Sequence, residues 1–201
     1  KKEKGTIEIT VEGEYNEAKG TFVMLFSGNG NVAIDYAFTA KTNLEPRQIG
    51  LVFDLPRTYD NLSWRRKAQW SVYPEDHIGR PVGSTAAFPR GVNSEGLATP
   101  RTCPDWPWSQ DANELGSNDF RSTKLNIFEA ALHAEDGPAV RTISAGSQHV
   151  RAWVDGDRVR FLVADYTNEG SAGFFIEHGI ATRPLKSGSE VKGRVVLSPM
   201  N

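Results

Sequence analysis

The chain contains 201 residues, with 23 Lys and Arg against 25 Asp and Glu, and its formal net charge is −2. This near balance, without a basic stripe, argues against nucleic acid as a partner, and no apolar run is long enough to cross a membrane. A chain of this length buries roughly 70% of its unfolded surface without help from disulfides or metals, and the single Cys103 can form no internal disulfide.

Alternating apolar and polar residues predict antiparallel strands in the first third of the chain. Ile7, Ile9 and Val11 alternate with polar residues, which is typical of a strand with one wet face. The more apolar 21–27 is expected to be covered on both faces. Gly and Asn at 28–31 favour a tight turn, because both tolerate positive φ. The predicted strands in this part are 7–11, 21–27, 32–39 and 49–55.

The stretch Trp64–Arg80 reads WRRKAQWSVYPEDHIGR and lacks the clean alternation of a core-facing strand or helix. Its aromatic rings, surrounded by charged and polar groups, suit a sugar, whose C–H face stacks on a ring while its hydroxyls require directional hydrogen bonds. The alternative is that Trp64 and Trp70 are core residues and the charges form a solvated rim.

The segment Pro81–Asn118 is rich in Pro and Gly and has no sustained periodicity. A connection of this length inside a domain is usually a functional loop or disordered, and Trp106 and Trp108 argue against disorder. We expect an ordered loop over a sheet face, with at least one Trp available to a ligand. The alternative, of equal weight, is that both Trp side chains pin the loop to its own sheet.

The remainder of the chain again predicts strands. Leu125–His133 has some helix propensity, but its position among strands and turns favours a strand. Asp155-Gly156 is typical of a two-residue hairpin turn. The other predicted strands are 120–124, 140–144, 150–154, 158–165, 174–176 and 191–197. Ten to twelve strands without a long helix predict an all-β fold, a large antiparallel β-sandwich spanning residues 1–201 as one domain.

No pattern in the sequence specifies a metal site, a cofactor or a catalytic constellation. The four His residues are scattered, and dinucleotide, phosphate-loop and GxSxG motifs are absent. Glu75 and Asp76 are adjacent, so in an extended segment they point to opposite sides, which is unsuitable for glycoside hydrolysis by facing carboxylates. His77 has the best surroundings for an acid or base. We therefore expect no catalysis by this chain alone.

The order of these features resembles the C-terminal β-sandwich domain of family 2 glycoside hydrolases of the β-galactosidase type. The resemblance rests on IGLVFDLPRTYDNLSWRRKAQWSVYPEDHIGR, NELGSNDFRSTKLNIFEAAL and ADYTNEGSAGFFIEHG. In the first of these segments Gly50, Trp64, Pro74, Asp76 and Arg80 fall in the order of the family's pattern. The resemblance covers roughly residues 20 to 198 and implies the galactose-mutarotase-like supersandwich fold.

The resemblance also implies a function and a set of ligand-facing residues. In that family the catalytic glutamates lie on a (β/α)₈ barrel of the same polypeptide, so this chain resembles an excised accessory domain. It would recognise carbohydrate and shape the substrate site of the barrel, in a periplasmic or secreted protein. The ligand-facing residues would be Trp70, Tyr73, Asp76, His77, Arg80, Trp106, Trp108 and Phe174.

Two other functions remain open from the sequence. An autonomous aldose 1-epimerase would need a facing acid and base, for which His77 or His149 with Glu177 are the candidates. A purely structural module would instead use Trp106, Trp108 and Phe174 at a domain interface, since exposed apolar patches often mark one.

Overall fold

The computed structural model describes residues 5–68, 80–87, 108, 123–135, 137–167 and 183–200. Within these ranges every paired strand is antiparallel and no helix occurs, which confirms the predicted all-β class. The strands are β1 (Thr6–Glu14), β2 (Ala18–Ser27), β3 (Val32–Ala40), β4 (Gln48–Pro56), β5 (Asn61–Arg66), β6 (Val82–Ala86), β7 (Lys124–His133), β8 (Ala139–Asp155), β9 (Arg158–Thr167) and β10 (Glu190–Met200).

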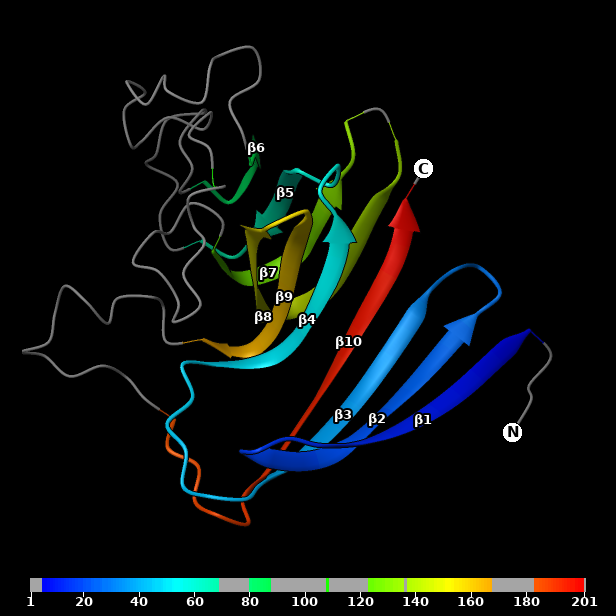
Figure 1. The fold of residues 1–201 in the computed structure, drawn as a ribbon. Coiled ribbons are helices and arrows are strands. Elements are labelled where there is room, and N and C mark those ends of the chain that lie inside the picture. The colour runs from blue at the N-terminus through cyan, green and yellow to red at the C-terminus, as the bar shows by residue number, and fades with distance from the viewer. Residues whose placement is uncertain are drawn as a thin grey trace, which may run out of the picture.

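The strands form one branched sheet that folds over on itself (Figure 1). The main order is β1-β2-β3-β10-β8-β7-β5-β6, and β9 pairs with both β8 and β4. The branch lies within β8, because residues 139–142 pair with β10 whereas residues 149–155 pair with β9. The single long strand β8 therefore belongs to both layers.

An irregularity in β7 and β8 accompanies the change of partner. Their register shifts on both sides of Ile127, and Asn126 has a φ of 55°, which is uncommon for a residue with a side chain. The Ser144 hydroxyl donates to the Ile127 carbonyl at 2.7 Å and accepts from the Gly146 amide at 3.1 Å. The sequence predicts two strands here, 140–144 and 150–154; the structure has one strand with this irregularity between them.

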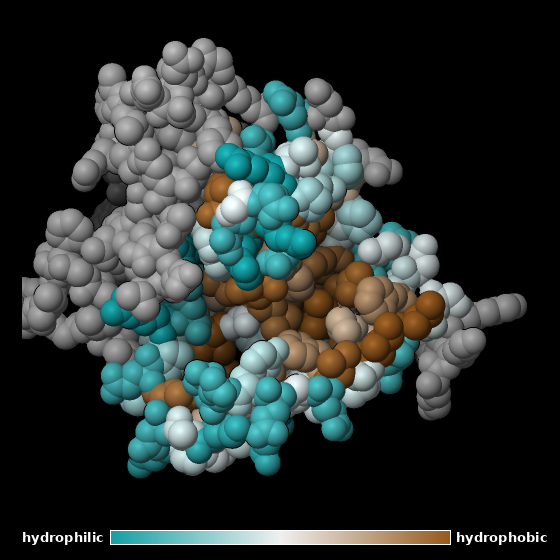
Figure 2. Space-filling model, viewed as in Figure 1, coloured by the Kyte–Doolittle hydropathy of each residue, from teal (hydrophilic) through white to brown (hydrophobic). Residues whose placement is uncertain are grey.

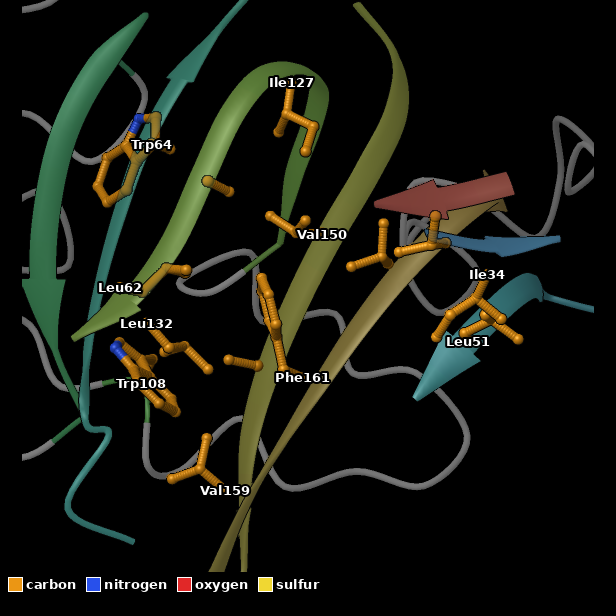
Figure 3. Close-up of a cluster of buried hydrophobic side chains, with 14 of the residues drawn as sticks. Ile34, Leu51, Leu62, Trp64, Trp108, Ile127, Leu132, Val150, Val159 and Phe161 are labelled. Atoms are coloured by element: carbon orange, nitrogen blue, oxygen red, sulfur yellow. The ribbon is translucent and has the colours of Figure 1, made fainter. Parts of the chain in front are cut away.

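The hydrophobic core lies between the layers and draws on both branches of the sheet. Figure 3 shows Leu62 and Leu132 with Phe161 and Val159 of β9, and all four side chains are fully buried. Ile34 of β3 and Leu51 of β4 extend the cluster toward the other layer. The core thus joins β4 and β9 to the layer formed by β1, β2, β3 and β10.

Apolar rows cross that layer from β10 to β1. Directly paired residues share one face of a sheet. The strand pairings give the rows Val195–Ile34–Met24–Ile9, Leu197–Val32–Phe26–Ile7 and Gly193–Tyr36–Phe22–Val11. Val195 is fully buried, whereas Ile7, Ile9 and Val11 are 60%, 43% and 40% exposed. Figure 2 shows this apolar surface as a hollow between β4 and the β1–β3 layer. We call the inner side of β1 and β2 the open apolar face; its residues are Ile7, Ile9, Val11, Phe22, Met24 and Phe26.

Two strands were not expected from the sequence. β5 runs through the start of the aromatic stretch and buries Trp64, and β6 lies inside the segment predicted to be a loop. The expectation that 21–27 is covered on both faces is met only in part, because β2 is half-buried along its length.

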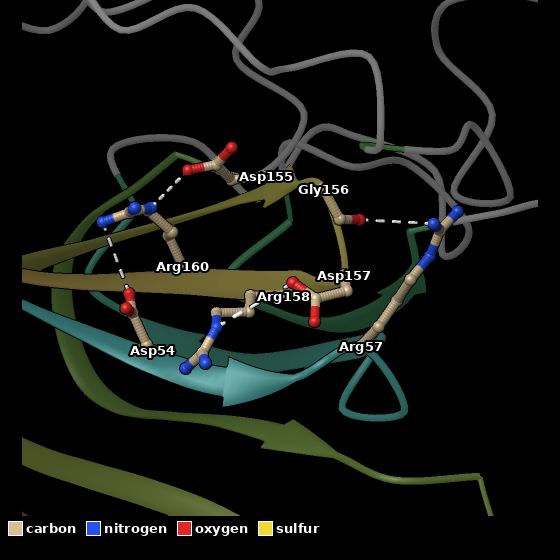
Figure 4. A network of polar contacts seen from close by, with 7 residues as sticks. All are labelled: Asp54, Arg57, Asp155, Gly156, Asp157, Arg158 and Arg160. Atoms are coloured by element: carbon tan, nitrogen blue, oxygen red, sulfur yellow. Dashed lines mark hydrogen bonds and ion pairs between the residues drawn. The ribbon is translucent and has the colours of Figure 1, made fainter.

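The predicted β8–β9 hairpin is confirmed, but its two turn residues are Gly156, at a φ of 59°, and Asp157, because Asp155 is the last residue of β8 and pairs with Arg158. Charged side chains surround it (Figure 4). Arg160 forms ion pairs with Asp155 at 2.7 Å and with Asp54 of β4 at 3.4 Å, and Arg57 donates to the Gly156 carbonyl at 3.3 Å. These contacts hold the tip of the β8–β9 hairpin against the end of β4.

Candidate functional site

Of the five residues proposed from the central stretch, only Arg80 belongs to the described structure. Trp70, Tyr73, Asp76 and His77 lie outside the described residues. The Arg80 carbonyl accepts hydrogen bonds from the Trp64 indole at 3.0 Å and from the Arg66 guanidinium at 3.2 Å.

Both ends of the central stretch are attached to the sheet. The Arg66 amide donates to the Pro81 carbonyl at 2.7 Å, and the Lys67 amide donates to the Asn126 carbonyl at 2.8 Å. The described residues that flank the stretch, 66, 67 and 81, are therefore hydrogen-bonded to each other or to β7.

Trp64 is a core residue, as the alternative interpretation of the central stretch allowed. Its side chain is 4% exposed, and its ring lies so close to Gly83 of β6 that a Cβ there would stand 2.7 Å from it. The Lys124 ammonium lies 4.5 Å from the centroid of the ring on the core side of β7, a cation–π arrangement.

Trp108 is fully buried, and its indole N–H donates to the Thr85 carbonyl at 2.9 Å. Figure 3 shows the ring within the core cluster of Leu62 and Leu132. A ring without exposed surface has no face on which a sugar can stack, so this position fits the alternative in which Trp108 pins its segment to the sheet. Trp106 and Phe174 lie outside the described residues.

A polar cluster that the sequence analysis missed lies where the two layers meet. The Tyr36 hydroxyl of β3 donates to Asp165 Oδ2 of β9 at 2.5 Å. The Gln148 amide of β8 donates to Asp165 Oδ1 at 3.0 Å and to the Arg194 carbonyl at 2.8 Å. Tyr36 and Gln148 are buried, whereas Asp165 is partly exposed. We call these three side chains the layer latch, because they join β3, β8 and β9.

Gly193 of β10 makes room for the layer latch. A Cβ at this position would collide with the Asp165 carboxylate and with the Tyr36 hydroxyl. Burial raises the pKa of Tyr36 well above its ordinary value, and the hydrogen bond to Asp165 raises it further. Tyr36 therefore holds its proton at neutral pH and acts as a donor to Asp165, not as a base.

Of the residues considered for an epimerase, only His149 belongs to the described structure. His149 accepts a hydrogen bond from the Asn126 amide at its Nδ1, at 3.0 Å. Its possible partner Glu177 and the other candidate, His77, lie outside the described residues.

The other described histidine, His133, pairs with a serine on the outer side of β5 and β7. Its Nε2 lies 2.7 Å from the Ser63 hydroxyl. Burial lowers the pKa of His133, and Glu129 partly opposes this effect. Among the described residues no group of three or more His, Cys, Asp or Glu could hold a metal ion. Within the same ranges no helix is long and apolar enough to cross a membrane.

The chain matches no protein-family model and no curated protein. Among solved structures it is similar to a candidate aldose 1-epimerase from Escherichia coli K12, at 10% identity and a TM-score of 0.44, with 100% of this chain and 67% of that chain covered. It is also similar to a galactose mutarotase-like protein from Lactobacillus casei, at 9% identity and a TM-score of 0.42, with 99% and 71% covered. At TM-scores below 0.5 neither a substrate nor a reaction follows from these similarities.

Proposed function

We propose that this chain is a non-catalytic carbohydrate-recognition and scaffold domain that packs on a neighbouring domain of a glycoside hydrolase of the β-galactosidase type. The observation that carries the scaffold role is the open apolar face. One of its rows of paired residues begins with the buried side chains of Val195 and Ile34 and ends with the exposed side chain of Ile9. A contiguous apolar surface that leaves the core in this way is typical of an interface.

The energetics of the open apolar face favour a covering partner. Full burial of an Ile or Val side chain contributes about 1.5–3 kcal/mol. The three apolar side chains of β1 in this face are each roughly half exposed. Covering Ile7, Ile9 and Val11 therefore contributes about 1 kcal/mol each, before the cost of association. The larger side chains of β2, which are only half-buried, add to this.

The carbohydrate role is supported by the aromatic and polar composition of the central stretch and by its resemblance to the glycosidase domain. The sheet can position that stretch, because its flanking residues Arg66, Lys67, Arg80 and Pro81 are hydrogen-bonded to strands or to each other. A ligand-facing segment attached to a rigid sheet at both ends is a suitable substrate-orienting element.

A hydrophobic dye tests the scaffold role. We expect the native chain to enhance the fluorescence of 8-anilinonaphthalene sulfonate, and Ile9→Lys to remove most of the enhancement. Ile143→Lys is the matched control, because Ile143 is an exposed β8 residue (48%) outside the open apolar face. No enhancement by the native chain, or equal losses in both variants, would contradict an accessible apolar face at β1.

Sugar titration tests the carbohydrate-recognition role, and an epimerisation assay tests whether the chain is non-catalytic. We expect galactose-containing oligosaccharides to shift the Trp fluorescence saturably, and Trp70→Ala to abolish the shift while Trp153→Phe preserves it. No response to any sugar would refute carbohydrate recognition by this chain.

Fresh α-galactose and α-glucose, followed by polarimetry, should equilibrate in the presence of the chain at the rate of the blank without protein. A much faster rate would make the chain an epimerase.

A further inference from the structure

β1 is a long edge strand. It begins the strand order of the sheet and, within the described residues, pairs only with β2. Its nine residues contain no Pro, so every second residue directs a backbone N–H and C=O away from β2. Such an edge is a template for another strand unless something in the sequence prevents pairing.

The two faces of β1 differ in chemistry. The inner face carries Ile7, Ile9 and Val11 of the open apolar face. The outer face carries Glu8 and Glu12, which are both exposed and form no ion pair with another described residue. Glu14, at the end of the strand, is paired with Lys41 at 2.7 Å. A strand added to this edge would therefore meet apolar side chains on one face and free carboxylates on the other.

We propose that an extended segment of a partner domain adds to the edge of β1 as a further strand, with apolar residues on its inner face and Lys or Arg on its outer face. This inference rests on the proposed scaffold function and names the element that covers the open apolar face. Backbone hydrogen bonds to β1 would supply part of the affinity, and the alternating side chains would supply the selectivity. Cross-strand pairs of opposite charge are favourable, whereas like charges directly opposite are not.

A second copy of the chain fits this edge less well. Two β1 strands paired antiparallel about Thr10 place Glu8 of one copy opposite Glu12 of the other. Pairing about Ile9 places Glu8 opposite Thr10, but the free carboxylates of both copies still lie diagonal to one another. Both arrangements gather four carboxylates at the interface, and Lys19, the described cation of β2 on this face, is paired in register with Glu14 instead. A basic segment neutralises the same carboxylates.

Two synthetic peptides test the proposal with the chain itself. The probe is the nonapeptide VKVKVKVKV, and its matched counterpart is VEVEVEVEV, both at low ionic strength and micromolar concentration. We expect the Lys peptide to bind at least about tenfold more tightly than the Glu peptide, because two carboxylates change from attraction to repulsion. Amide chemical-shift changes on binding should concentrate in β1 and β2. A Lys peptide with alternate N-methylated amides should bind much more weakly, because it cannot complete the strand pairing.

Charge-swap variants separate strand addition from general attraction to an acidic chain. Glu8→Lys with Glu12→Lys should reverse the preference, so that the Glu peptide binds more tightly. Glu17→Lys with Glu45→Lys is the control, because it changes the net charge equally at exposed loop positions, and it should retain the preference for the Lys peptide.

Several outcomes would overturn the proposal. Failure of both peptides to bind, an unchanged preference in the β1 charge-swap variant, or shift changes at another strand would each do so. A stable dimer in light scattering that Ile9→Lys dissociates would make a second copy the occupant. The proposed function is tested separately, because binding of the dye at the open apolar face does not depend on either peptide.

Discussion

Replacing Tyr36 with Phe removes the hydroxyl of the layer latch with little change in shape. The hydroxyl is buried and donates to a carboxylate at 2.5 Å, and hydrogen bonds to charged groups contribute about 1.5–3 kcal/mol. Asp165 would keep only the Gln148 amide as a donor within the described structure. We expect Tyr36→Phe to lower the free energy of unfolding by about 2 kcal/mol at pH 7.

The same variant should change the pH dependence of stability. The pKa of Tyr36 in the folded chain is raised, first by burial and then by the hydrogen bond to Asp165. The folded state thus holds a proton that the unfolded state releases above its ordinary pKa of about 10. The stabilisation from Tyr36 is fully present below pH 10 and decreases above it, by up to about 1.4 kcal/mol per pH unit. Tyr36→Phe should lack this part of the alkaline slope.

Urea unfolding followed by Trp fluorescence at pH 7, 9, 10 and 11 measures both effects. Tyr59→Phe is the control, because Tyr59 packs against the core but its hydroxyl makes no hydrogen bond to the described residues; its cost should be under about 0.5 kcal/mol. Equal costs for the two variants at pH 7, or identical alkaline slopes for wild type and Tyr36→Phe, would refute the reasoning.

Three further predictions concern single positions. Gly193→Ala should cost about 3 kcal/mol or more, because its Cβ collides with Asp165 and Tyr36; an unchanged urea midpoint would contradict this. Trp108→Phe should cost about 1–3 kcal/mol, because it leaves the Thr85 carbonyl without the buried indole donor, and Trp153→Phe serves as its control in the same unfolding assay. Glu129→Gln should lower the pKa of His133 further, because Glu129 opposes the effect of burial; a rise, followed by NMR of the imidazole protons, would show that Glu129 has the opposite effect.

The apolar pattern of the sequence predicted β1, β3, β4 and β9 within a few residues of their observed ranges, because their own side chains carry the pattern. The pattern did not predict burial correctly for β1, whose Ile7, Ile9 and Val11 are exposed. β6 was missed for a physical reason. Its sequence VGSTA has little apolar surface, and the ring that covers Gly83 comes from Trp64 of β5. A strand whose packing is supplied by its neighbour shows no periodicity of its own.

The layer latch could not be predicted from the sequence. Tyr36 lies 129 residues from Asp165, and the alternation of its strand marks it only as a core residue. The space for the cluster comes from Gly193, which in the sequence looks like any glycine in a strand. The position of Trp108 could not be predicted either. A Trp in a Pro- and Gly-rich segment suits both a ligand-binding platform and an anchor to the sheet, and only the fold places this one in the core.

The layer latch and the open apolar face together explain how one layer can stay folded while its edge remains available. β3 is tied to the other layer by Tyr36, and β10 by the Arg194 carbonyl, so the inner half of the layer is held by polar contacts as well as by the core. Within the described residues, β1 and β2 are attached through their neighbours in the sheet, through the half-buried side chains of β2 and through the ion pair between Glu14 and Lys41. The free carboxylates Glu8 and Glu12 disfavour pairing of β1 with its own copy. An edge that is apolar inside and acidic outside thus resists self-association while remaining open to a basic strand.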